Sequence, residues 1–159
     1  MSKLIFKELS HKIMNAAFEV HNQLGPGLLE HLYERALVIE LIERGFEIQQ
    51  QKTVIAKYKD HVIGKHVLDL IVNDSVVLEL KAVSTILPIH KQQALSYLKA
   101  TGYKLAIVIN FGSPSVQSHR VAYTKKWKDS TRITPIYELR EFFKNLKEFA
   151  LKNPSISSS

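Results

Sequence analysis

Three charged side chains stand inside two otherwise apolar segments, and their types and spacing suit metal-assisted chemistry. Asp69 lies in the run VLDLIV, and Glu79 and Lys81 lie in VVLELKAV. Both runs are typical of strands, in which residues two positions apart, such as Glu79 and Lys81, share a face. Neighbouring carboxylates repel each other unless a cation lies between them, and Mg²⁺ prefers a few carboxylate oxygens plus water. The hypothesis is a divalent metal site with Lys81 beside it.

The turn between the two segments predicts how they pair. If residues 73–75 form a three-residue loop, Val72 pairs with Val76, and counting back places Asp69 directly opposite Glu79. The alternative is a solvated face on which Glu79 and Lys81 form only an exposed pair. The apolar neighbours of these charges argue against a fully wet face.

Two further pairs have helical spacing. Gln93 and Tyr97 are four residues apart, and an amide and a phenol together can hold a water, a phosphate oxygen or a ligand carboxylate. The alternative is an ordinary helix surface with Tyr97 in the core. Glu30 and Tyr33 open another helix, where a carboxylate stabilises the helix N-terminus. The functional alternative is that Glu30 points into the same site as the strand carboxylates.

Hydrophobic periodicity predicts the elements that position these residues. Helices are expected over residues 10–24, 28–44, 88–101 and 136–152, and strands over 47–58, 61–72, 76–83, 104–111 and part of 116–127. Lys59 and Asp60 are expected to form a turn, and Gly102 to end a helix. This order predicts an α/β fold with a mixed β-sheet flanked by helices. With 159 residues and no linker, a single domain over 1–152 is expected, followed by a flexible tail over 153–159.

Composition excludes several classes of site and protein. The chain has no cysteine, so disulfides, thiolate zinc sites and cysteine nucleophiles are excluded. Its histidines form no HxxxH or HExxH pattern, and no serine lies in a nucleophile-elbow context. No apolar run approaches the ~20 residues of a membrane span, and the first residues lack the pattern of a signal peptide. A cytoplasmic protein without membrane contact is expected.

The net charge of +7 is compatible with binding to a polyanion. Residues 120–132 hold five Lys or Arg against one acid. Lys125, Lys126 and Lys128 surround Trp127, and such cations with an aromatic ring suit nucleic acid. The alternative is a basic edge strand that discourages aggregation.

The motifs in their order resemble the GxxExxY family of the PD-(D/E)XK nuclease superfamily. The residues that carry the resemblance are Gly27, Glu30 and Tyr33; Asp69; Glu79-Leu80-Lys81; Gln93 and Tyr97, which are similar to the QxxxY motif of RecB-like nucleases; and the strand ending Ile109-Asn110-Phe111-Gly112. Leu68 stands where the superfamily's name has proline.

The resemblance implies a restriction-endonuclease-like core and a metal-dependent nuclease acting on DNA or RNA. Asp69 and Glu79 would bind Mg²⁺ or Mn²⁺, Lys81 would assist the attacking water, and Glu30, as a further metal ligand, and Gln93 would complete the site. Tyr97, Lys125, Lys126, Trp127 and Lys128 are the expected nucleic-acid contacts. The alternative function is a catalytically inert module for binding nucleic acid or assembling a complex. A second copy of the chain, in a homodimer, is a further candidate partner.

Overall fold

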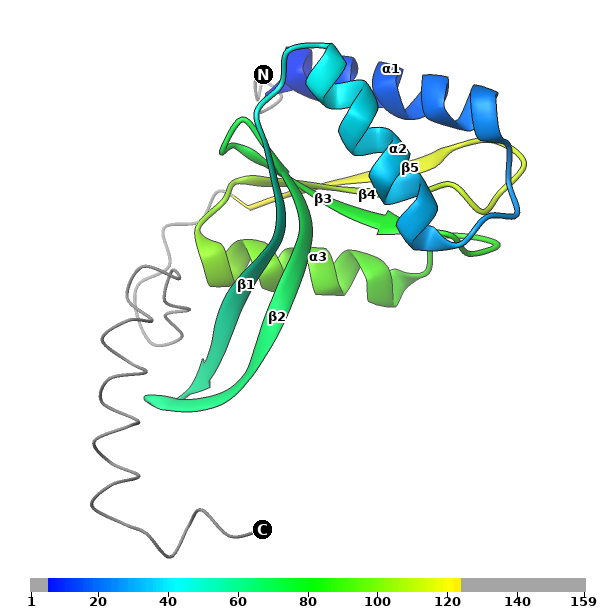
Figure 1. Ribbon diagram of the computed structural model, residues 1–159. Coiled ribbons are helices and arrows are strands. Elements are labelled where there is room, and N and C mark those ends of the chain that lie inside the picture. The colour runs from blue at the N-terminus through cyan, green and yellow to red at the C-terminus, as the bar shows by residue number, and fades with distance from the viewer. Residues whose placement is uncertain (1–5, 124–159) are drawn as a thin grey trace, which may run out of the picture.

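The computed structural model describes residues 6–123, which form one five-stranded sheet and three helices (Figure 1). In chain order the elements are α1 (Lys7–Leu24), α2 (Glu30–Glu43), β1 (Ile48–Tyr58), β2 (His61–Val72), β3 (Val76–Lys81), α3 (Pro88–Thr101), β4 (Leu105–Asn110) and β5 (Gln117–Ala122). The strands lie in the order β1-β2-β3-β4-β5, with β3 and β4 parallel and the other neighbours antiparallel. The mixed sheet flanked by helices is therefore confirmed. The helix expected over 136–152 and the tail over 153–159 lie outside the described residues.

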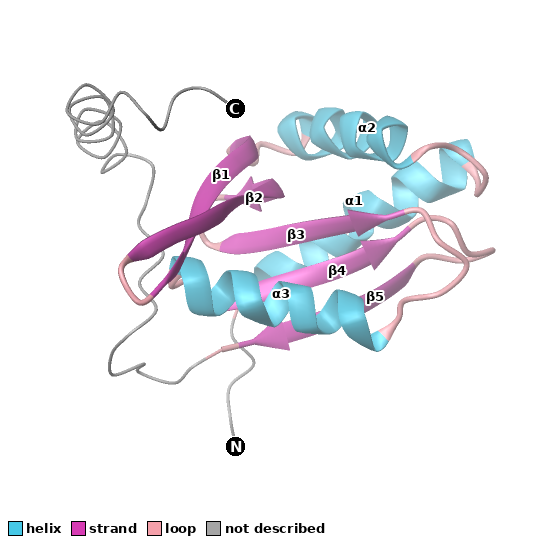
Figure 2. Ribbon diagram, turned by 90° about the horizontal axis from the view of Figure 1, so that it is seen from below, coloured by secondary structure: helices cyan, strands magenta, loops and turns pink. Residues whose placement is uncertain are grey.

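Helices cover both faces of the sheet (Figure 2). The buried side chains of α1 and α2 share one core with β3 and β4, and Ala94, Tyr97 and Leu98 of α3 form a second core on the opposite face. All six residues of β4 are buried, as expected for a strand covered on both sides. Parallel pairing of β3 with β4 requires a crossover, and α3 supplies it.

Most predicted ends of helices and strands lie close to the observed ones. Pro88 opens α3, and Gly102 ends it with φ of 79°, its N–H donating to the Leu98 carbonyl. The differences are an earlier start of α1 at Lys7, a later start of α2 at Glu30 and an earlier end of β3 at Lys81. The start of α2 is delayed because Leu29 has an extended backbone.

The hairpin of β1 and β2 is much longer than the strand beside it. Its tip is the predicted two-residue turn, with φ of 51° at Lys59 and 54° at Asp60. Ile63 is an extra residue on β2, where the pairing shifts between Ala56 and Lys57. In the described structure β2 pairs with β3 over residues 70–72 alone. The far part of the hairpin therefore runs beyond the sheet (Figure 1).

Candidate active site

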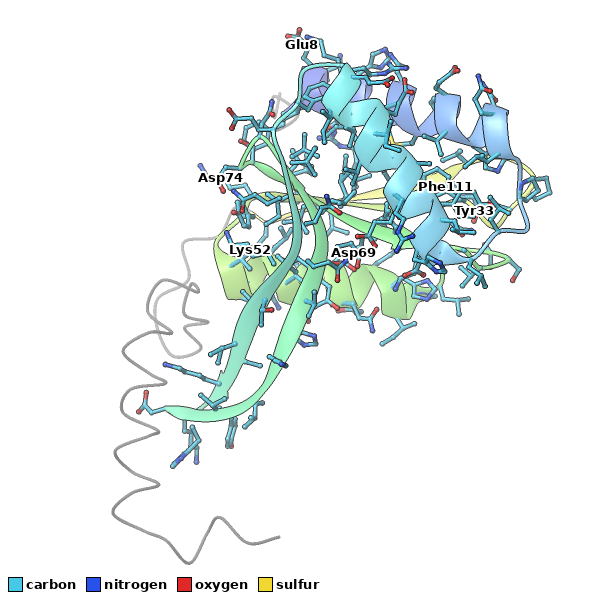
Figure 3. The ribbon with its side chains drawn as sticks, viewed as in Figure 1. Glu8, Tyr33, Lys52, Asp69, Asp74 and Phe111 are labelled. Carbon is cyan, nitrogen blue, oxygen red and sulfur yellow. The ribbon has the colours of Figure 1, made fainter. Side chains whose placement is uncertain are left out.

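Asp69 and Glu79 come from β2 and β3, and the turn between these strands brings them together. The pairing begins with Val72 opposite Val76, as a three-residue loop predicts, and it stops one residue short of Asp69. There Oδ2 of Asp69 accepts a hydrogen bond from the Leu80 N–H at 2.8 Å. The carboxylate thus replaces the backbone ladder in holding the two strands. Figure 3 shows Asp69 where the hairpin leaves the sheet.

The alternation of side chains between the two faces of β2 is interrupted at Asp69. Leu70 packs in the core under α1 and α2, whereas Leu68 packs in the core around α3. In a regular strand these two side chains would share a face. Across from this point on β1, Gln51 has a left-handed backbone with φ of 51°, a conformation that costs energy for a residue other than glycine and is common at functional sites. This local irregularity releases Asp69 from the ladder, and its carboxylate bonds to β3 instead.

Glu79 is buried, Asp69 is partly buried, and the two carboxylates oppose each other's ionisation. Glu79 is 6% exposed, and its Oε1 atom is buried without a hydrogen-bond partner. Burial, with the charge of Asp69, raises the pKa of Glu79 to about 8, and Lys81 acts in the opposite direction. Burial also raises the pKa of Asp69 to about 6, although the hydrogen bond from Leu80 opposes this shift. The described chain alone therefore leaves this acid pair short of positive charge and of donors.

Helix α2 brings two more carboxylates close to the pair. The charges of Glu30 and Glu34 both raise the pKa values of Asp69 and Glu79. Glu30 is exposed in the first turn of the helix. Glu34 is partly buried and accepts a hydrogen bond from Gln51 Nε2 at 2.8 Å. Glu34 was not among the residues predicted from the sequence, although its spacing of four residues from Glu30 on a helix was the available signal.

The donor set fits a hard divalent cation. Asp69 and Glu79 offer oxygen atoms only, and Oε1 of Glu79 is a buried acceptor that a cation would satisfy. Within residues 6–123 no group of three or more Asp, Glu or His side chains is arranged to hold a metal. Mg²⁺ is usually bound by one or two carboxylates and keeps several waters, so a pair is sufficient. The role of Glu30 as a ligand, direct or through water, stays a prediction.

The end of β3 that carries Glu79 and Lys81 is fixed by a side chain from β4. Oδ1 of Asn110 accepts a hydrogen bond from the Val83 N–H at 2.9 Å, and its Nδ2 donates to the Val83 carbonyl at 2.8 Å. At Gly112 a Cβ atom would lie 2.5 Å from the Val83 backbone nitrogen and oxygen, so only glycine fits this close approach. Asn110 and Gly112 therefore position the segment after Lys81.

The segment from Gly27 to Tyr33 divides into a structural part and a part near the acids. Tyr33 is fully buried; its hydroxyl donates to the Gly25 carbonyl and accepts from the Leu28 N–H at 3.1 Å. Its ring stacks on Phe111, with centroids 4.9 Å apart (Figure 3). Tyr33 thus holds the loop between α1 and α2, and this loop sets where Glu30 begins the helix.

Replacing Tyr33 with Phe tests this structural role. Phe keeps the ring stacked on Phe111 but loses both hydrogen bonds of the hydroxyl. We expect the free energy of unfolding to fall by about 1–2 kcal/mol, measured by denaturant unfolding. Tyr58, which is 60% exposed, provides the matched control, since Tyr58→Phe is expected to leave stability unchanged. Unchanged stability of Tyr33→Phe would contradict the structural role.

Gln93 and Tyr97, the second pair with helical spacing, differ in how far their side chains are buried. Tyr97 is 8% exposed and packs in the core around α3, so its ring has little surface for stacking on a base. Burial and the charges of Glu79 and Asp69 raise its pKa to about 12, so the phenol stays protonated near the acids. Gln93 is exposed, and its side chain makes no hydrogen bond to the described part of the chain. Its predicted role in orienting water stays a prediction.

The predicted nucleic-acid contacts Lys125, Lys126, Trp127 and Lys128 lie outside the described residues. Between residues 6 and 123, no helix has the length and apolar character needed to cross a bilayer.

Comparisons with known proteins add a family match. Residues 7–121 match the model of a family described as the PD-(D/E)XK nuclease superfamily. Among solved structures, the chain is similar to "SSO0001", with 16% identity and a TM-score of 0.49 over 76% of this chain and 59% of that one. It is also similar to an alkaline exonuclease (LHK-Exo) from Laribacter hongkongensis, with 11% identity and a TM-score of 0.43 over 96% and 81% of the two chains. The chain thus spans 59% of the length of the SSO0001 chain. A comparison with curated proteins finds no match.

Proposed function

The chain belongs to the PD-(D/E)XK nuclease superfamily, and from this premise we propose that it is a metal-dependent nuclease that hydrolyses phosphodiester bonds in DNA, with RNA as the second substrate class. Mg²⁺ or Mn²⁺ is the proposed cation. Within the superfamily we assign the chain to the GxxExxY family, on the basis of Gly27, Glu30 and Tyr33.

The observation that carries this proposal is the acid pair of Glu79, which is buried, and Asp69, which is partly buried. A structural carboxylate in a folded core normally has hydrogen bonds or a paired cation. Here Oε1 of Glu79 is buried without a partner and the pKa values of both acids are raised. Raised pKa values of this kind, caused by burial and by a specific charged neighbour, are typical of functional sites.

Each side chain of the site has a separate role in the proposed reaction. Asp69 is fixed in orientation by the Leu80 N–H, and with Glu79 it forms the negative end of the site. Lys81, partly exposed next to them, supplies a positive charge that orients the attacking water and stabilises the negative charge developing on the phosphate. Glu30 of α2, whose charge acts on both acids, and Gln93 of α3 are assigned the role of holding water at the edge of the site.

A bound divalent cation would supply a Lewis acid that lowers the pKa of a water molecule and stabilises the leaving oxygen. Asp69 and Glu79 are the residues that would hold it.

The experiment that tests the proposal is a cleavage assay on single-stranded, double-stranded and branched DNA and on RNA, each with Mg²⁺, Mn²⁺ or EDTA. We expect cleavage that requires a divalent ion and that falls at least ~100-fold in Asp69→Asn. Asn is the sharper replacement because its side-chain oxygen still accepts the Leu80 hydrogen bond. Lys81→Ala is expected to lower the cleavage rate and to retain metal binding, because Lys81 acts on water and phosphate.

Glu47→Gln is a suitable control because the Glu47 side chain is exposed and lies just before β1, where its backbone pairs with Asn73. Cleavage that persists in EDTA or in Asp69→Asn would contradict the proposed site. Absence of cleavage on every substrate, together with nucleic-acid binding that Asp69→Asn retains, would favour an inert binding module. The proposed homodimer and the cytoplasmic location stay predictions.

A further inference from the structure

The far part of the β1–β2 hairpin, residues 52–67, is a projecting arm. It leaves the sheet beside Asp69 and extends past α3 (Figure 1). Residues 58–67 are all solvent-exposed, whereas Val54 and Ile55 on β1 are buried. The exposed apolar side chains of the arm are Tyr58 at 60%, Val62 at 39%, Ile63 at 68% and Val67 at 42%. An exposed apolar strand pair of this kind normally marks a surface that binds a partner.

The charge of the arm is complementary to phosphate. Residues 52–67 contain Lys52, Lys57, Lys59 and Lys65 and two histidines, against the single acid Asp60. Helix α2, on the other side of the acid pair, contains four glutamates and one arginine. A polyanion approaching the acid pair is therefore repelled by α2 and attracted by the arm.

The base of the arm is anchored to the body of the protein. The His66 ring packs edge-on against Tyr97 of α3, with centroids 5.0 Å apart. Lys52 Nζ donates to the Tyr103 hydroxyl at 3.0 Å, and this hydroxyl donates to Asp74 at 2.6 Å. These contacts give the arm a defined direction from the acid pair.

We propose that the arm binds duplex nucleic acid by lying along a groove, with Lys59 and Lys65 on the phosphates, so that the duplex is the substrate form presented to the acid pair. This inference rests on the proposed nuclease function. From Lys52 to the tip the arm measures about 23 Å, which corresponds to about seven base pairs. A two-stranded ribbon fits the major groove of B-DNA, whose width admits it. The exposed side chains of Val62 and Ile63, which lie between Lys59 and Lys65 in the sequence, then contact bases and sugars.

The test measures binding separately from cleavage. All proteins carry Asp69→Asn and are assayed in EDTA with a labelled DNA duplex and the corresponding single strand, over a range of salt concentrations. Lys59→Gln/Lys65→Gln is compared with Lys7→Gln/Lys12→Gln, which removes two exposed lysines from α1. Each phosphate contact contributes about 0.9 to the slope of log affinity against log salt. The arm variant is therefore expected to lose about 2 from that slope on the duplex and to bind it about tenfold more weakly at moderate salt.

Lys59→Arg/Lys65→Arg, which retains the charge, is expected to bind as the unaltered arm does. Equal slopes for the arm variant and the α1 variant would overturn the inference, as would a loss confined to the single strand. Light scattering provides a second readout, the oligomeric state. If the protein with the unaltered arm is a dimer and the Lys59→Gln/Lys65→Gln variant is a monomer, a second copy of the chain binds the arm and the inference is overturned. Cleavage is scored independently with Asp69 intact. If the arm variant loses salt dependence of duplex binding as expected but the protein with Asp69 intact cuts no substrate, the nuclease proposal fails and the arm remains a duplex-binding surface.

Discussion

Changing Glu79 to Gln is expected to move activity and stability in opposite directions. Cleavage should fall at least ~100-fold, because the variant loses a proposed metal ligand. The metal-free variant should nevertheless be more stable than the wild type above pH 8, because the pKa of Glu79 is raised to about 8 and its ionised form is unfavourable in the folded protein. The stabilisation that Mg²⁺ or Mn²⁺ gives to the wild type should disappear in the variant.

The size of the stability gain follows from the pKa. Each unit by which the folded pKa exceeds the unfolded one represents about 1.4 kcal/mol of differential interaction. Gln has nearly the shape of Glu and remains neutral, so it avoids this cost at high pH. At about pH 5 Glu79 is protonated in the folded protein, and the two proteins should differ little. Thermal unfolding at both pH values, with and without metal, measures the difference.

Glu43→Gln is the matched control, since Glu43 is an exposed carboxylate at the end of α2. It should change neither cleavage nor the pH dependence of stability. A Glu79→Gln protein that is less stable than the wild type above pH 8 would contradict the interpretation of Glu79 as a strained carboxylate. It would instead assign Glu79 a structural interaction.

The general architecture could be predicted because it depends on local patterns. The apolar run at 104–111 predicts a strand covered on both faces, and β4 is one. Pro88 and Gly102 enclose α3 as helix-start and helix-stop signals predict. The turn at 73–75 predicts the β2–β3 register, and the observed pairs agree with it. Each of these features is determined by a few consecutive residues, so the sequence is sufficient.

The detail of the site could be predicted only in part, because it depends on contacts between distant elements. Counting along the strands predicts that Asp69 lies close to Glu79. It assumes a regular ladder, so it does not predict the left-handed backbone of Gln51 or the change of face that accompanies it at Asp69. The approach of Glu34 depends on how α2 lies on the sheet, and helical periodicity alone does not specify this. The role of Tyr33 as the anchor of a loop likewise requires the position of Gly25 in three dimensions.

The length of the arm is a further example of a tertiary property. The strand patterns of 47–58 and 61–72 predict the two strands of the hairpin, and both exist. They do not predict that β3, only six residues long, would leave most of the hairpin without a third strand in the described structure. A projecting arm results from this mismatch in length, and it is visible only when the strands are paired.

The wild-type protein is expected to show opposite pH trends with and without a divalent cation. Asp69 and Glu79 have folded pKa values of about 6 and about 8, raised above their ordinary values of 3.8 and 4.5. When the pKa of an acid is higher in the folded than in the unfolded state, the folded state binds more protons at every pH between these two pKa values. Their contribution to stability is complete below about pH 4 and is lost as the pH rises through about 6 and about 8. The metal-free protein should therefore lose stability over this window.

With Mg²⁺ or Mn²⁺ the trend should reverse, because protons and the cation compete for the same two carboxylates. The rise in melting temperature caused by metal should be small near pH 5, increase through pH 6 to 8 and then level off. Subtracting the same curves for Glu79→Gln removes the contribution of the histidines and other groups that titrate in this range. A metal-induced rise that is independent of pH, or that is retained in Glu79→Gln, would show that the cation binds elsewhere. A rise that follows the two pKa values would identify the acid pair as the metal site, because only groups that ionise in this window and contact the cation produce that dependence.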